Sequence, residues 1–198
     1  MKKFTNVLKS VLFELAYIMM LSLVAFGISL INVFALKIVL FILNIVAFSV
    51  AMFFWYMQKG ATEYDNRRKN NLKRKVMIET EQYIEIDSSK EYKKYKGFLI
   101  GGINVGLMLL LCIINLIIVE TGSTSTVVSG IIKGLYYGFY GILFTISESV
   151  SIYIAIYGVV LMALVVSFAY IFGAKREKKN KEDKIETIKN QVYGDKKN

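Results

Sequence analysis

Four long apolar stretches dominate this sequence, and each is long enough to cross a lipid bilayer. A hydrocarbon core of about 30 Å requires about 20 apolar residues in a helix. The hydrophobic residues, 55% of the chain, gather in these stretches instead of recurring at amphipathic spacing. We therefore predict an all-α membrane protein with four transmembrane helices arranged as two hairpins. The predicted spans are Val11–Ile31, Ile38–Met57, Phe98–Val119 and Ile152–Gly173.

The basic residues are divided unequally between the two sides of this bilayer. Of the 25 lysines and arginines, 23 lie before the first span, between the second and third spans, or after the fourth. Only Lys37 and Lys133 lie on the opposite side. Loops rich in Lys and Arg stay in the cytoplasm. We therefore expect a plasma-membrane protein with both termini cytoplasmic, and the frequent Lys, Ile and Asn residues indicate a bacterial source.

This topology divides the chain into a first transmembrane hairpin (1–57), a basic cytoplasmic loop (58–97), a second hairpin (98–174) and a basic cytoplasmic tail (175–198). The basic runs in the loop and the tail predict attraction to anionic lipids at the cytoplasmic face. We do not expect nucleic acid as a partner, because no nucleic-acid-binding motif accompanies these runs and acids interrupt the tail.

The loop and the tail also carry signals of local structure. Two acid–base pairs at i,i+4 spacing favour a helix at the start of the loop. The alternating segment QYIEID, residues 82–87, is compatible with a short strand. Three apolar residues on one face predict a brief amphipathic helix in the tail. The pairs are Glu63/Arg67 and Asp65/Lys69, and the apolar residues of the tail are Ile185, Ile188 and Val192.

Residues 127–146 are the ambiguous part of the second hairpin. The segment is long and apolar enough for a fifth span. A fifth span would, however, place the basic tail outside, against the positive-inside rule. Glycines at 130, 134, 138 and 141 form a stripe where another helix can approach closely. A neighbouring polar stripe consists of Ser129, Lys133, Tyr137, Tyr140 and Glu148. This periodicity predicts an interfacial or re-entrant helix on the outer side, rather than a full span.

Four polar side chains lie inside the predicted spans, namely Glu14, Asn44, Asn104 and Asn115. Glu14 is the only acid among them and lies near a span boundary, where it can reach the headgroups or a lysine. Each asparagine needs another helix, because lipid offers its amide no partner. Glu14 and Asn104 fall in the inner half of the bilayer, and Asn44 and Asn115 fall in the outer half. Two cross-helix contacts are therefore possible, serving either helix packing or a polar lining for a solute path.

Two overlapping Gly-x-x-x-Gly pairs lie at the inner end of the third span. Gly97 pairs with Gly101, and Gly102 pairs with Gly106. Small residues at this spacing allow the backbones of neighbouring helices to approach. We therefore expect the third span to be the centre of helix packing.

The residues on which many catalytic and metal sites depend are missing. The sequence contains no His, and its single Cys112 can form neither an internal disulfide nor a metal site by itself. The phosphate-binding loop and the Gly-x-Ser-x-Gly nucleophile motif are also absent. We therefore expect no catalytic activity, no metal site and no cofactor.

The remaining features are ones that pack helices together. They favour a non-enzymatic subunit that assembles with other membrane proteins, in transport or envelope upkeep. The alternative is a small oligomeric channel or transporter lined by the four intramembrane polar residues. Against it, the spans contain no proline break and no run of ionisable residues. A further alternative is an immunity or sensor protein.

Overall fold

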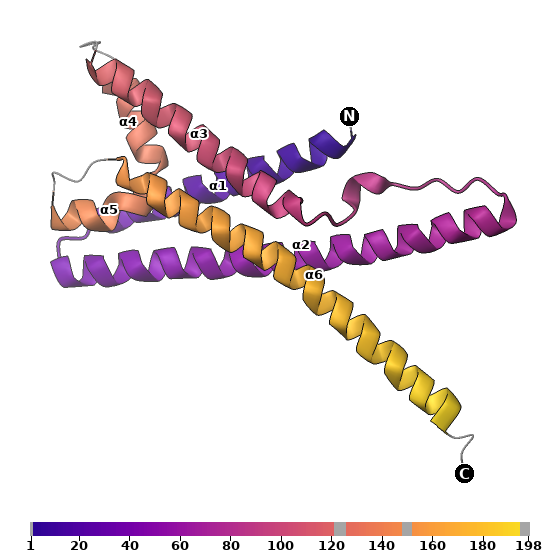
Figure 1. The fold of residues 1–198 in the computed structure, drawn as a ribbon. Helices are drawn as coiled ribbons and strands as arrows, with labels where there is room; N and C mark the ends of the chain where they lie inside the picture. Colours follow the sequence, from indigo (N-terminus) through magenta and orange to yellow (C-terminus); the bar gives the residue numbers. More distant parts are fainter. Residues whose placement is uncertain (1, 121–125, 148–151, 195–198) are drawn as a thin grey trace.

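The computed structural model describes residues 2–120, 126–147 and 152–194, and all regular elements within these ranges are helices (Figure 1). They are α1 (Lys2–Ser29), α2 (Phe34–Thr80), the 3-10 helix η1 (Ser88–Lys90), α3 (Tyr95–Glu120), α4 (Thr126–Leu135), α5 (Tyr137–Ile146) and α6 (Ile154–Gly194). Four of them, α1, α2, α3 and α6, are long and apolar enough to cross a membrane. The chain therefore has the all-helical, four-span architecture that its apolar stretches predict.

Helix α2 continues far beyond the apolar stretch that predicts it. It contains 47 residues, which corresponds to about 70 Å at 1.5 Å per residue. The helix therefore runs unbroken through the first half of the predicted loop and ends at Glu81, whose φ of 54° is left-handed. The strand considered for residues 82–87 is wrong, since this segment is irregular. A single short segment without a neighbouring strand has no ladder to join.

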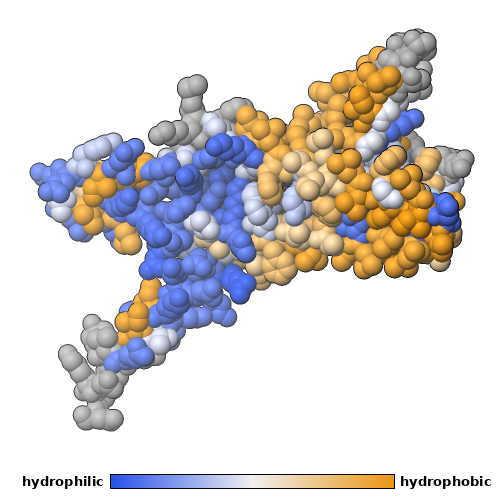
Figure 2. Space-filling model, turned by 180° about the vertical axis from the view of Figure 1, so that it is seen from behind, coloured by the Kyte–Doolittle hydropathy of each residue, from blue (hydrophilic) through white to orange (hydrophobic). Residues whose placement is uncertain are grey.

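Helix α6 also continues past its apolar half. Its 41 residues include nearly all of the predicted tail, so the expected brief tail helix is the end of a long one. We call residues 58–80 the α2 arm and residues 174–194 the α6 arm. Figure 1 shows that the two arms diverge from the point where α2 and α6 cross. Figure 2 shows that hydrophilic residues gather over the arms and hydrophobic residues over the rest of the bundle.

Two glycines allow α2 and α6 to touch at their crossing. A Cβ atom on Gly60 would lie 2.0 Å from the carbonyl oxygen of Tyr170. A Cβ atom on Gly173 would lie 1.8 Å from the carbonyl oxygen of Met57. No side chain fits at either distance, so both positions require glycine. Neither residue belongs to the Gly-x-x-x-Gly pairs at the start of α3.

Helices α4 and α5 form a bent pair instead of one straight helix. Their axes differ by 96° across a break at Tyr136, which matches the interfacial or re-entrant helix predicted here. Among the four glycines of the predicted stripe, Gly138 approaches Leu21 of α1 and Gly141 approaches Phe41 of α2. A Cβ atom on either of the other two, at positions 130 and 134, would meet no atom within 4 Å. The last member of the polar stripe, Glu148, lies outside the described residues.

A buried serine holds the break between α4 and α5. The hydroxyl of Ser22, on α1, donates a hydrogen bond to the carbonyl oxygen of Leu135 at 2.7 Å. The same hydroxyl accepts one from the backbone N–H of Gly138 at 3.1 Å. Ser22 therefore satisfies backbone groups at the bend in an apolar environment, where unpaired groups are costly.

Candidate functional site

The structure brings Glu14 and Asn104 together, as their depth in the spans suggests. Both side chains are 1% exposed, and the Asn104 side chain lies close enough to act on the Glu14 carboxyl group. The hydroxyl of Tyr56 donates a hydrogen bond to Glu14, with an O–O distance of 3.3 Å. The intramembrane carboxyl group is therefore enclosed by side chains of α1, α2 and α3 instead of facing lipid headgroups.

Asn44 and Asn115 do not meet, and each finds another partner. The side-chain amide of Asn44 donates to the carbonyl oxygen of Leu21 at 3.2 Å. The side-chain oxygen of Asn115 accepts a hydrogen bond from the hydroxyl of Ser129 at 2.7 Å. The two asparagines are kept apart because α2 and α3 are not adjacent in the bundle: no Cα atoms of these helices lie within 8 Å of each other. Both amides therefore join a span to its immediate neighbour.

The four glycines predicted to pack helices lie on two faces of α3. Gly97 and Gly101 face α6, where a Cβ atom would come within 3.2 Å of Ser167 and 2.8 Å of Ala163, respectively. A Cβ atom on Gly102 or Gly106 would meet no atom within 4 Å. Within the described residues, only the first pair therefore lies where α3 touches another helix.

A buried ion pair lies where the spans meet the arms. The ammonium group of Lys96, at the start of α3, lies 2.5 Å from the carboxylate of Glu63 on α2. The hydroxyl of Tyr170, on α6, donates a hydrogen bond to the other carboxylate oxygen of Glu63. Glu63, Lys96 and Tyr170 are 7%, 5% and 0% exposed. This triad joins three helices through charge-assisted hydrogen bonds, which are stronger than neutral ones.

Tyr92 covers the triad from the segment before α3. Its ring stacks on the ring of Tyr170 with a centroid distance of 5.2 Å. Its backbone N–H donates to the carbonyl oxygen of Glu63 at 3.0 Å. Burial raises the pKa of the Tyr92 hydroxyl. The segment that returns from the α2 arm is therefore fastened to the bundle at the ion pair.

A second basic residue, Lys59, extends the polar cluster toward Glu14. Its ammonium group donates a hydrogen bond to the hydroxyl of Ser10 on α1. It also lies 4.9 Å from the centroid of the Trp55 ring, a cation–π distance. Lys59 is also close enough to the triad for the charge of Glu63 to act on it. We call this set the inner polar cluster, and it comprises Ser10, Glu14, Tyr56, Lys59, Glu63, Lys96 and Tyr170.

The triad is not evident from the sequence, because each of its members fits another pattern. Glu63 has i,i+4 spacing to Arg67, Lys96 belongs to the basic loop, and Tyr170 lies within an apolar stretch. One available signal was position, because Lys96 and Glu63 both lie near span ends on the same predicted side. The pair of Asp65 with Lys69 does form, at 2.7 Å.

Side chains of the inner polar cluster bond to one another. Each carboxyl group in it has a hydrogen-bond partner. Within the described part of the chain, no three His, Cys, Asp or Glu side chains are placed to hold a metal ion. Comparisons with protein-family models, curated proteins and solved structures find no match to this chain. The architecture therefore defines the class, which is a multi-pass helical membrane protein.

Proposed function

We propose that this chain is a non-enzymatic subunit that assembles with another membrane protein through its two arms. In this proposal the arms lie in the cytoplasm, as the distribution of basic residues predicts. The inner polar cluster holds α1, α2, α3 and α6 together at the base of the arms. The protein then presents the arms to its partner and performs no chemistry itself.

Apolar side chains exposed on the arms are the observation that carries this proposal. On the α2 arm, Leu72, Val76 and Ile78 are 54%, 44% and 76% exposed. On the α6 arm, Ile185 and Ile188 are 42% and 58% exposed. Figure 2 shows hydrophobic patches toward the far ends of both otherwise hydrophilic arms.

Lipid is not the expected cover for these side chains. Leu72 lies 15 residues beyond the end of the second predicted span, and Ile188 lies 15 residues beyond the fourth. At 1.5 Å per residue, both lie about 22 Å along the helix from the span ends. Exposed apolar patches rimmed by polar residues mark interaction sites in many proteins. A protein surface is therefore the better partner.

The charge of the arms indicates the kind of surface that fits them. Residues 67–75 contain six basic residues and no acid. Asp65, on the α2 arm, already binds Lys69 at 2.7 Å and Lys181 of the α6 arm at 3.4 Å. The hydrogen bond from Lys69, with the nearby charge of Lys181, lowers the pKa of Asp65. We therefore propose an acidic partner surface with apolar residues at its centre.

The burial of the intramembrane polar residues supports a subunit over a channel. Glu14 and the three asparagines of the spans are all between 1% and 7% exposed. Each makes a hydrogen bond inside the bundle. A channel lined by these residues would require the helices to separate and these bonds to break.

The proposal is tested by purifying the tagged full-length chain gently from the membranes of cells that produce it natively. We expect a partner in fixed stoichiometry with the wild type and its loss in Ile188→Ala. The matched control is Ile113→Ala, because Ile113 is 60% exposed but lies within a span. A homo-oligomer that conducts ions in vesicles, and loses conductance in Glu14→Gln, would contradict the proposal and favour the channel.

A further inference from the structure

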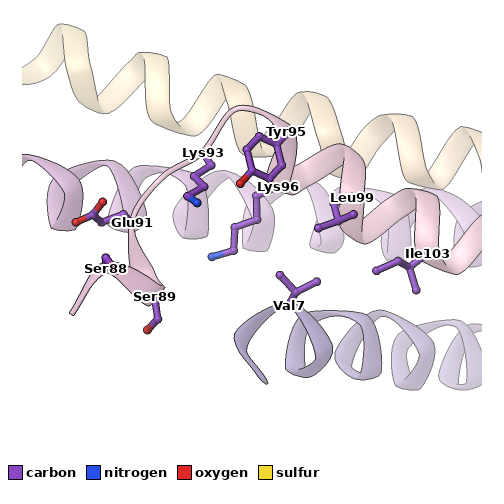
Figure 3. Close-up of a pocket in the computed structure, with 9 residues that line it drawn as sticks. All are labelled: Val7, Ser88, Ser89, Glu91, Lys93, Tyr95, Lys96, Leu99 and Ile103. Atoms are coloured by element: carbon purple, nitrogen blue, oxygen red, sulfur yellow. The ribbon is translucent and has the colours of Figure 1, made fainter. Parts of the chain in front are cut away.

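A cavity of about 380 Å³ lies beside the inner polar cluster, where α1 and α3 meet the segment around η1. Three elements form its wall, so it exists only in the folded chain. Figure 3 shows the serines at one end of the cavity and the apolar residues at the other, with two lysines between them. The lining residues are Val7, Ser88, Ser89, Glu91, Lys93, Tyr95, Lys96, Leu99 and Ile103.

The apolar part of the cavity continues into the membrane-facing surface of α3. Leu99 and Ile103 are one turn apart, and their side chains are 44% and 36% exposed. Val7 of α1 lies opposite them (Figure 3). Because Leu99 and Ile103 belong to a transmembrane helix, an acyl chain of the bilayer can reach the cavity sideways without crossing water.

The polar part of the cavity carries an uncommitted positive charge. The carboxylate of Glu91 is neutralised by Arg74 at 2.6 Å and accepts a hydrogen bond from Asn70 at 2.8 Å. Lys96 is committed to the triad. Lys93 makes no ion pair within the described residues, and its ammonium group lies 5.6 Å from the centroid of the Tyr95 ring. The ammonium group of Lys93 is therefore available to bind an anion.

Hydrogen bonds hold the polar wall in place. The side-chain amide of Asn6, on α1, donates to the hydroxyl of Ser89 at 3.0 Å. The carboxylate of Asp87 accepts a hydrogen bond from the backbone N–H of Ser89 at 2.9 Å. The side-chain amide of Asn70 donates to the carbonyl oxygen of Asp87 at 2.8 Å. The wall is therefore formed before any ligand arrives, which lowers the entropy cost of binding.

We infer that this cavity binds one anionic glycerophospholipid from the leaflet at the charged end of the bundle. The phosphate lies at Lys93 and accepts a hydrogen bond from the hydroxyl of Ser88. An acyl chain lies along Leu99 and Ile103. A soluble phosphate would use only the polar part and leave the apolar part empty. This site is independent of the partner proposed for the arms.

Native mass spectrometry of the full-length chain in detergent tests the inference. Phosphatidylglycerol and phosphatidylcholine with identical acyl chains are added separately, and the fraction of protein that retains one lipid is measured. We expect retention of phosphatidylglycerol over phosphatidylcholine. We expect Lys93→Gln to lower this preference about five-fold, because one lysine near an anionic lipid surface contributes about that factor. Val7→Phe, which fills the apolar part, lowers the retention of both lipids.

The control is Lys94→Gln, which removes the same charge from an exposed neighbouring position. An equal loss of preference in Lys94→Gln would overturn the inference, because it would indicate attraction to the basic surface as a whole. Displacement of the lipid by millimolar inorganic phosphate or glycerol phosphate would also overturn it, in favour of a soluble ligand. Unchanged melting temperatures of the variants without added lipid establish that they are folded.

Discussion

Lys96 and Glu63 form a 2.5 Å ion pair between α3 and α2, although no Cα atoms of these helices lie within 8 Å of each other. Two long side chains bridge a gap that the backbones leave open. The space between them is closed by α6, whose Tyr170 hydroxyl donates to Glu63. The pair therefore joins helices that are not direct neighbours, at the level where the arms begin.

The first prediction is that breaking this ion pair destabilises the bundle. Lys96→Met leaves a buried carboxylate without its counter-charge, and we expect the free energy of unfolding to fall by about 3–5 kcal/mol. The measurement is unfolding in mixed micelles. Lys178→Met is the matched control, because Lys178 pairs with Glu182 on the exposed surface and such pairs contribute at most about 1 kcal/mol. Equal effects of the two substitutions would contradict a structural role for the triad.

The second prediction concerns the crossing of α2 and α6. Gly60→Ala places a Cβ atom 2.0 Å from the carbonyl oxygen of Tyr170, so the helices must separate. We expect a loss of about 1–3 kcal/mol in the free energy of unfolding, as for other overpacked sites. Gly102→Ala is the control, because its Cβ atom meets nothing within 4 Å. We expect no loss of stability in Gly102→Ala. Thermal unfolding of both variants in detergent is the measurement.

The third prediction concerns the bend between α4 and α5. Ser22→Ala removes the acceptor of the Gly138 N–H and the donor to the Leu135 carbonyl. Each buried group left unpaired costs about 1–3 kcal/mol. We expect hydrogen exchange at the Gly138 amide to accelerate by about ten-fold or more, since 1.4 kcal/mol corresponds to a factor of ten. Ser29→Ala is the control, because the Ser29 hydroxyl bonds only within its own helix. Unchanged exchange in Ser22→Ala would show that another group holds the bend.

The fourth prediction is the orientation in the membrane. In a Cys112→Ser background, a cysteine at Val127 is expected to react with an impermeant thiol reagent added outside intact cells. A cysteine at Lys189 is expected to react only after the membrane is permeabilised, because the basic arms remain in the cytoplasm. Both positions are exposed in the folded chain. Labelling of Lys189→Cys in intact cells would contradict a cytoplasmic C-terminus and indicate either the opposite orientation or a fifth span.

The number and type of the membrane helices could be read from the sequence. An apolar stretch of about 20 residues has few other stable arrangements in lipid, because the backbone must satisfy its own hydrogen bonds. The same principle predicted that the segment at 127–146, with its polar and glycine stripes, is not an ordinary span. The depth of Glu14 and Asn104 along their helices also made a contact between them geometrically possible, and the structure places the two side chains near each other. All of these properties depend on position along one helix.

The tertiary structure decided which helices are neighbours, and that order is not encoded in hydropathy. Asn44 and Asn115 share a depth but lie on helices that do not touch, so they bind Leu21 and Ser129 instead. Gly60 is isolated in the sequence, yet it lies at the crossing of α2 and α6, where its Cβ position meets the backbone of Tyr170. Contacts between helices depend on how well their side chains fit together. Apolar side chains are as apolar as the lipid around them, so their hydrophobicity alone does not select a neighbouring helix.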